Sequence, residues 1–206
     1  MALVKYNNNS ISAVTSAAGF PAGALTLIKT LTASSSATLS FVDGSSDVVL
    51  DNTYPVYLFK FINIHPASTQ PLLFQASTNT GSSYGVTMTS SAFRAYHNEA
   101  GTSTSLSADT GNDQAQATGF QKLHGNITNA NDHGGSGEMY FFNPSSTTFV
   151  KHFISTINAS LDDAVVQEQF IAGYFNTTSA IDAIQFKMNS GNIDSGSIKL
   201  YGIKDS

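Results

Sequence analysis

The sequence contains no cysteine, which excludes disulfides, cysteine-based zinc sites and thiol chemistry. Charge is also scarce: Asp, Glu, Lys and Arg make up 11% of the 206 residues, against about 25% in an ordinary globular domain. Hydrophobic residues remain at 41%, so uncharged polar residues have replaced the charged ones. We expect such a chain to fold, because disorder goes with low hydrophobicity and high net charge.

Basic clusters and long apolar runs are missing as well. The net charge is −5, and the nine Lys and Arg residues are scattered from Lys5 to Lys204. Phosphate binding needs clustered basic residues, so no nucleic-acid partner is expected. No apolar run approaches the roughly 18 residues of a transmembrane helix, and residues 1–16 lack the apolar core of a signal peptide. We therefore expect no membrane partner and synthesis in a cytoplasm without export.

Short alternating apolar segments separated by turn residues run through most of the chain. They predict strands at residues 25–31, 37–42, 57–64, 71–77, 84–88, 120–127, 138–143, 148–158, 165–175, 181–189 and 197–203. Residues 57–64 are apolar at nearly every position, as in a strand buried on both faces. The one helix candidate, residues 90–100, could equally continue the strand before it. The pattern predicts an all-β fold, an antiparallel, jelly-roll-like β-sandwich over residues 24–206.

A short N-terminal arm, residues 1–23, precedes the predicted sandwich. It carries isolated apolar side chains among Asn, Ser and Ala, too few to form a core of its own. Such a segment is either a frayed terminus or one that becomes ordered against a neighbouring subunit. The candidate partner-binding residues are Leu3, Val4, Tyr6, Ile11 and Phe20.

Two polar segments interrupt the strand pattern. Residues 100–118 contain almost no large apolar residue apart from Leu106, which predicts a long exposed loop. Residues 128–137 form the most turn-rich run of the chain. Loops at one end of a sandwich often carry function. We therefore take Asn131, Asp132 and His133 as candidate recognition residues.

Few residues have the spacing of a metal or catalytic site. His124 with Asp132 and His133, joined by Asp113, would suit zinc or another divalent cation. However, no two histidines have the spacing of a ready-made ligand pair, and Asp132 and His133 equally fit a turn. No Gly-x-Ser-x-Gly elbow is present, and no catalytic pair of carboxylates stands out. We expect neither a cofactor nor enzymatic activity.

The C-terminus carries the most specific pattern, Ser-Gly-Asn-Ile-Asp-Ser-Gly-Ser-Ile-Lys-Leu-Tyr-Gly-Ile at residues 190–203. It resembles the ending of small virion structural proteins of tailed bacteriophages, especially marine ones. Residues 56–64 are similar to a Val-Tyr-x-Phe-x-x-Asn-Ile strand of the same proteins. Physically, the alternating residues 184–188 and 198–200, joined through Gly191 and Gly196, predict a hairpin that closes the sandwich.

The resemblance implies a non-enzymatic component of the exterior of a phage particle, made in the host cytoplasm. The leading interpretation is a capsid decoration (cement) protein. It would be a homo-oligomer, such as a trimer, that binds the major capsid protein or other virion proteins through the arm and a sandwich edge. The alternative is a fibre- or tail-associated receptor- or carbohydrate-binding module. Residues 100–137 would then recognise a host-surface glycan.

Overall fold

All regular structure described in this protein is β-structure. The computed structural model describes residues 25–161 and 164–204, and every regular element in these ranges is a strand paired antiparallel to its neighbours. The prediction of an all-β antiparallel sandwich is confirmed. In the same ranges, no helix could span a membrane. The N-terminal arm, with Leu3, Val4, Tyr6, Ile11 and Phe20, lies outside the described residues.

Eight strands form a jelly-roll framework. They are β1 (Leu25–Thr32), β2 (Leu39–Val42), β3 (Val56–Pro66), β4 (Gln70–Ser77), β8 (Gln121–Ile127), β9 (Gly135–Phe142), β12 (Ala183–Met188) and β13 (Ile193–Ile203). They pair from the outside inward: β1 with β13, β2 with β12, β3 with β9 and β4 with β8. This nested ribbon folds into two facing sheets, β1-β13-β3-β9 and β2-β12-β4-β8, which is the arrangement of a jelly roll.

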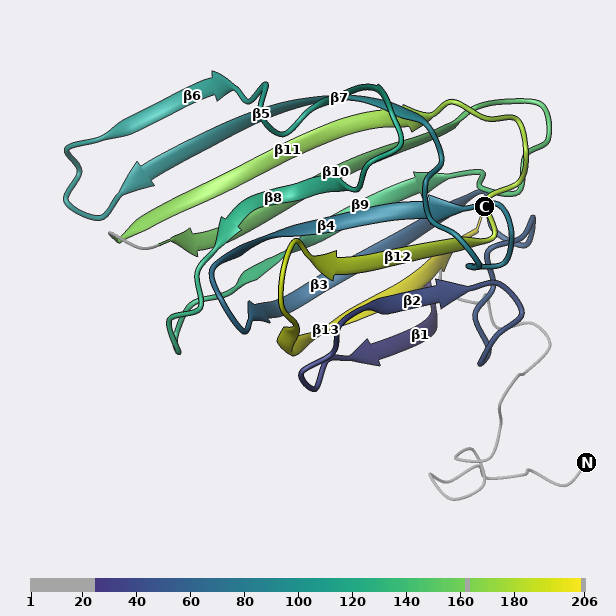
Figure 1. Ribbon diagram of the computed structural model, residues 1–206, viewed down its shortest axis with the longest axis horizontal. Helices are drawn as coiled ribbons and strands as arrows, with labels where there is room; N and C mark the ends of the chain where they lie inside the picture. The colour runs from purple at the N-terminus through teal and green to yellow at the C-terminus, as the bar shows by residue number, and fades with distance from the viewer. Residues whose placement is uncertain (1–24, 162–163, 205–206) are drawn as a thin grey trace, which may run out of the picture.

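Five further strands extend the first of these sheets beyond β9. They are β5 (Met88–Asn98), β6 (Thr104–Ala108), β7 (Gln114–Ala117), β10 (Lys151–Leu161) and β11 (Val165–Phe175). The resulting nine-stranded sheet has the order β1-β13-β3-β9-β10-β11-β5-β6, with β7 also paired to β5. In Figure 1 the four-stranded sheet lies in front of the nine-stranded sheet, and β5 and β6 extend past it at the top.

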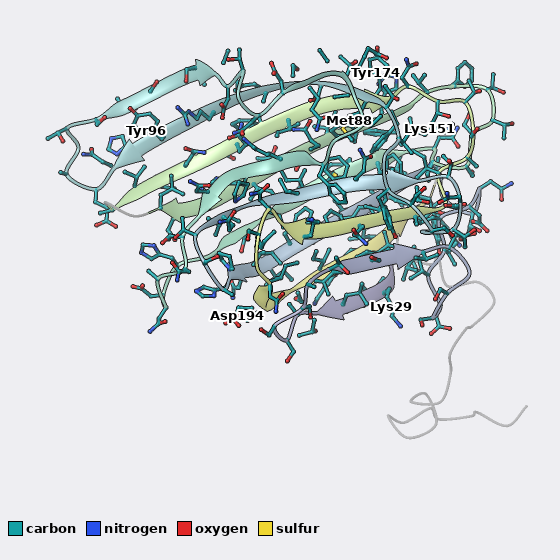
Figure 2. The ribbon with its side chains drawn as sticks, in the orientation of Figure 1. Lys29, Met88, Tyr96, Lys151, Tyr174 and Asp194 are labelled. Atoms are coloured by element: carbon teal, nitrogen blue, oxygen red, sulfur yellow. The ribbon has the colours of Figure 1, made fainter. Side chains whose placement is uncertain are left out.

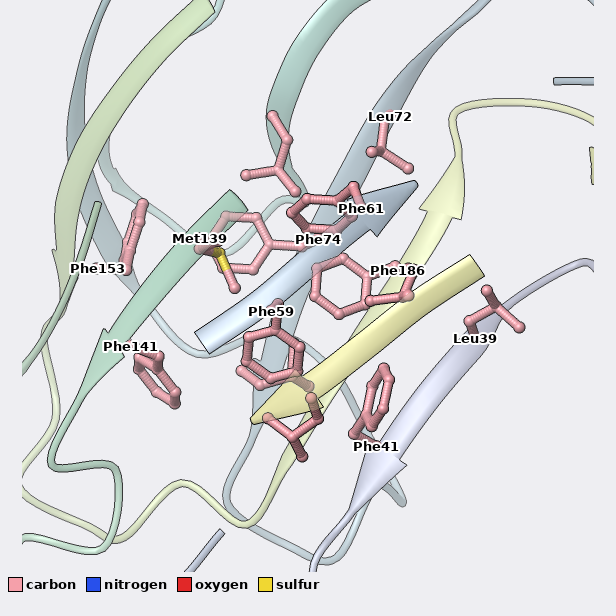
Figure 3. Packing of buried hydrophobic residues seen from close by; sticks show 14 of the residues in the cluster. Leu39, Phe41, Phe59, Phe61, Leu72, Phe74, Met139, Phe141, Phe153 and Phe186 are labelled. Atoms are coloured by element: carbon pink, nitrogen blue, oxygen red, sulfur yellow. The ribbon is translucent and has the colours of Figure 1, made fainter. Parts of the chain in front are cut away.

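The core lies between the two sheets and is rich in phenylalanine. Strand alternation places one face of each strand inward, as in β12, where Ile184, Phe186 and Met188 are buried. The ring of Phe186 contacts four other rings, from both sheets (Figure 3). They are those of Phe41, Phe59, Phe61 and Phe74, with centroids 5.2–6.3 Å away. Burial of such rings is the largest apolar contribution to holding the sheets together.

The predicted long loop at residues 100–118 is wrong. Residues 104–108 and 114–117 form β6 and β7, which lie end to end along β5, with Leu106 paired to Ala95 and Gln114 to Ser90. A turn at residues 109–113 separates them. The small polar side chains of this segment misled the prediction because an edge strand needs backbone pairing more than buried side chains.

Three boundaries around the neighbouring strands also differ. Residues 84–87 are not in a strand. Strand β5 begins at Met88 and includes residues 90–98 of the helix candidate, because residues 88–98 pair continuously with β11. Residues 135–137 of the predicted turn-rich run belong to β9. A side chain at Gly137 would collide with the Thr156 carbonyl oxygen, so glycine here serves close strand packing, not a turn.

The predicted C-terminal hairpin is also wrong. Strand β12 belongs to the four-stranded sheet and β13 to the nine-stranded sheet, so residues 189–192 cross between the sheets. Both glycines do adopt the predicted positive φ, +71° at Gly191 and +106° at Gly196. Alternation alone could not reveal the crossing, because two strands of one hairpin and two strands of facing sheets have the same period.

Candidate functional site

A polar depression lies at one end of the sandwich, where the β8–β9 connection meets the ends of β3, β10 and β13. Its volume is about 590 Å³. It is lined by Asn63, His65, Asn131, Asp132, His133, Gly134, Ser160, Asp194 and Ser195. Figure 2 shows Asp194 at this end of the sandwich and Lys151 toward the other. The structure therefore places all three predicted recognition residues in one site.

An irregularity in the pairing of β3 with β13 shapes one wall of this depression. The register shifts twice between Ile193 and Ser197, and Asn63 has a φ of +50°. Gly196 lies so close to the Asn63 carbonyl that a side chain there would collide with it. The backbone N–H of Asn63, which is not paired to a neighbouring strand, donates to Ser136 Oγ at 3.0 Å. Such bulges re-aim side chains, which here brings His65 and Asp194 to the same rim.

Two imidazoles and two carboxylates face this depression in loose pairs. His65 Nδ1 is 3.8 Å from Asp194 Oδ2, and His133 Nε2 is 3.8 Å from Asp132 Oδ1. His65 Nε2 lies 3.2 Å from the Ala130 carbonyl oxygen, which ties β3 to the β8–β9 connection. His133 Nδ1 is buried without a hydrogen-bond partner. The site therefore keeps acceptors and donors that its own residues leave unused.

The chemistry of the lining favours binding of a neutral polar molecule. Carboxylate, amide and hydroxyl groups line the depression, and no Lys or Arg does. Such groups accept from and donate to hydroxyls, but they offer an anion no cationic partner. Among the described residues, no serine hydroxyl is hydrogen-bonded to a histidine nitrogen.

The metal-site hypothesis does not fit the structure. His124 is fully buried on β8, whereas Asp132 and His133 line the depression and Asp113 is exposed in the β6–β7 turn. In the part of the chain that the structure describes, no group of three His, Asp or Glu side chains could hold a metal ion. Proximity of His124 and His133 in the sequence was misleading because β8 carries His124 into the interior.

His124 instead belongs to a buried polar layer between β8 and the extension of the large sheet. Its Nε2 lies 3.4 Å from the Gln167 carbonyl oxygen, and its Nδ1 has no hydrogen-bond partner. The Gln169 side-chain oxygen accepts from the amide groups of Gln167 and Asn112 nearby. Burial lowers the pKa of His124 to about 4, so the imidazole is neutral at pH 7.

A second candidate surface is the outer face of the nine-stranded sheet, meaning the side turned away from the four-stranded sheet. Eight large hydrophobic side chains among the described residues are 38–74% exposed, and seven of them lie on this face. The seven are Leu25, Leu27, Ile62, Phe93, Leu106, Ile154 and Val166. Phe93 stacks on Phe170 at 4.5 Å between centroids. Exposed apolar residues gathered on one surface mark a contact site.

The outer side of the four-stranded sheet has the opposite character. Gln185 donates to Ser40 Oγ at 3.0 Å. Gln75 donates to the carbonyl oxygens of Thr118 and Gly119 at 3.0 and 2.8 Å, so the chain itself covers part of this side. The apolar residues of the nine-stranded sheet are therefore a property of one face and not of the surface in general.

Sequence reasoning found part of the depression and missed the outer face. Asn63, His65 and Asp194 come from parts of the chain distant from residues 131–133 and meet them only through strand pairing. The outer face had a signal: residues 57–64 are apolar at nearly every position, and Leu58 on this face is only 3% exposed. Comparisons with protein-family models, curated proteins and solved structures found no match to this chain.

Proposed function

We propose that this chain is a non-enzymatic structural protein of a bacteriophage virion, a capsid decoration protein that binds the outside of the major-capsid lattice. The resemblance of residues 190–203 to the ending of phage virion proteins suggests the setting. The observation that supports an assembly role most is the outer face of the nine-stranded sheet, with its seven exposed large hydrophobic side chains. Exposed apolar patches mark protein or membrane interaction sites and ligand-binding grooves, and a protein partner fits the virion setting.

The N-terminal arm is the proposed contact with the capsid. The described chain begins at Leu25, on the edge strand of the nine-stranded sheet, and residues 1–23 precede it in the sequence. Burying one large apolar side chain contributes roughly 1.5–3 kcal/mol, and ordering each residue costs about 1–2 kcal/mol. For residues 3–6, which hold three of the apolar side chains, these opposing terms nearly cancel, so one arm alone would bind weakly. Several arms held by one oligomer would bind a repeating lattice firmly.

Deletion of residues 1–23 is therefore expected to abolish binding to phage capsids without unfolding the sandwich. Co-sedimentation of full-length and truncated protein with capsids that lack the protein measures binding, and thermal unfolding checks the fold. A Leu3→Ser/Val4→Ser/Tyr6→Ser variant keeps the arm length and should lose binding as well. Equal binding by all three forms would exclude the arm as the capsid contact.

The alternative function, recognition of a host-surface glycan, is favoured by the polar depression. Its carboxylate, amide and hydroxyl groups suit the hydroxyls of a neutral saccharide, and His133 Nδ1 is buried there without a partner. A receptor-binding module of a fibre or tail would present such a site at the end of a sandwich.

The Asp132→Ser/His133→Ser double variant separates this alternative from decoration. If the depression binds a glycan, the variant should bind host cells or a neutral glycan array at least about tenfold more weakly, as expected for losing charged hydrogen bonds. Asp113→Ser, exposed in the β6–β7 turn, is the matched control and should bind normally. If neither the wild type nor any variant bound host cells or a glycan, glycan recognition would be excluded and capsid decoration would remain.

A further inference from the structure

We infer that the outer face of the nine-stranded sheet binds the same face of a second copy of this chain, giving a two-fold symmetric dimer. The inference rests on the proposed function, to which it adds the partner of this face. It is carried by the way in which apolar and charged side chains are arranged in rows across the strands.

The first row is uncharged along its whole length. Directly paired residues cross the sheet from β1 to β11 on the outer face. They are Leu27, Tyr201, Leu58, Tyr140, Ile154 and Ala172, and we call them the apolar row. Leu27 and Ile154, near its two ends, are 51% and 50% exposed. Apart from the hydroxyls of Tyr201 and Tyr140, this row offers water no polar side-chain group, and Leu58 between these two tyrosines is only 3% exposed.

Next to the apolar row, this face carries charged side chains of both signs. Lys199, Lys60 and Glu138 are directly paired across β13, β3 and β9. We call these three residues the charged row; it continues through Thr156 to Phe170, and Glu168 lies on the same face of β11 one row further along, paired with Asn158. Lys60 Nζ is 3.4 Å from Glu138 Oε2 within the molecule. Lys199 and Glu168 form no ion pair with any described residue, so one positive and one negative group remain unpaired.

These two rows make the face complementary to itself. A two-fold axis parallel to the strands and beside β9 turns each row onto itself and exchanges its ends. The apolar row then meets an apolar row, and Lys199 comes to lie over β11, where Glu168 is its neighbour one row along. Sheets stack face to face with strands nearly aligned, which this axis allows. Two-fold dimers are also the commonest protein oligomers, because one surface serves both subunits.

The size of the face is sufficient for a stable dimer. Seven strands from β1 to β5 at about 4.8 Å spacing, each roughly 30 Å long, give roughly 1,000 Å². A typical specific interface buries about 800 Å² on each partner. Phe93, Phe170 and Val166 lie at the β11–β5 side of this area.

The test is the mass of the purified full-length chain in solution, without capsids, by light scattering over a range of concentrations. We expect a dimer. Ile154→Glu, in the apolar row, should weaken association roughly 100-fold, because a carboxylate would be buried in an apolar contact. Phe149→Glu is the matched control, since Phe149 is 69% exposed but lies in the β9–β10 connection and in no strand of this face, and it should remain dimeric.

Charge reversal tests the orientation of the two copies. Lys199→Glu and Glu168→Lys should each weaken self-association about tenfold, because like charges would meet twice. An equal mixture of the two variants should associate as tightly as the wild type, since opposite charges meet again in the mixed dimer. Failure of the mixture to recover would overturn the two-fold arrangement.

A wild-type monomer at all concentrations, or an oligomer that Ile154→Glu leaves intact, would overturn the inference. Self-association and capsid binding are measured independently, so the two proposals can fail independently. A monomer that still binds capsids would contradict only the dimer, and a dimer that binds no capsid would contradict only the proposed function.

Discussion

Replacing Phe186 with alanine is expected to lower the free energy of unfolding by about 3–5 kcal/mol, the range for removing a buried phenyl ring. Phe186 is fully buried on β12, and its ring centroid is 5.2 Å from those of Phe59 and Phe61 on the opposite sheet. It also contacts the rings of Phe41 and Phe74 in its own sheet. The cavity would therefore open between two sheets whose strand pairing keeps them from collapsing into it.

Phe149→Ala is the matched control for this effect. It removes the same ring from a site that is 69% exposed, so its expected cost is within about 0.5 kcal/mol. The chain has no tryptophan, and urea unfolding followed by circular dichroism gives both values. Equal losses in the two variants would show that Phe186 does not join the sheets as the ring distances indicate.

Acidification is expected to remove about 3 kcal/mol of stability through His124 alone. Burial lowers the pKa of His124 to about 4, against about 6.5 in the unfolded chain. Above pH 6.5 both states are neutral at this residue. Between pH 6.5 and 4 the unfolded chain binds a proton that the folded protein does not. The free energy of unfolding therefore decreases as the pH is lowered through this range, and the loss is complete below pH 4.

The His124→Gln variant isolates this contribution. Its free energy of unfolding, measured with urea at pH 7 and pH 4, should fall by about 3 kcal/mol less than that of the wild type. His97→Gln, at an exposed position on β5, should fall as much as the wild type. If His124→Gln and the wild type fell equally, the imidazole would have to be protonated inside the folded protein.

Strands with strict alternation and large side chains could be predicted from the sequence. Residues 165–175 and the Ile184, Phe186 and Met188 face of β12 are as predicted, because burial of one side fixes both the period and the face. Residues 104–108 could not be recognised, since their small polar side chains bury little and the pairing with β5 decides their structure. The sequence also could not show that β13 belongs to the nine-stranded sheet, because pairing with β1 and β3 decides this.

The candidate site was accessible to sequence reasoning only in part. The turn-rich composition of residues 128–137 indicated a polar loop at one end of the sandwich, and Asn131, Asp132 and His133 do line the depression. His65 and Asp194 join them because a bulge at Asn63 shifts the register of β3 against β13. Register shifts depend on both strands at once, so neither segment alone predicts them.

The outside-in pairing of the framework strands has a consequence for how the chain reaches its fold. Leu25 pairs with Ile203, and the innermost pair, β4 with β8, is itself separated by three inserted strands. Contacts between such distant segments must wait for large loops to close, so folding is expected to take milliseconds to seconds. During synthesis, β1 and β2 remain without their partners until the last strands leave the ribosome. The nascent chain therefore carries unpaired edges for most of its translation, when aggregation competes with folding.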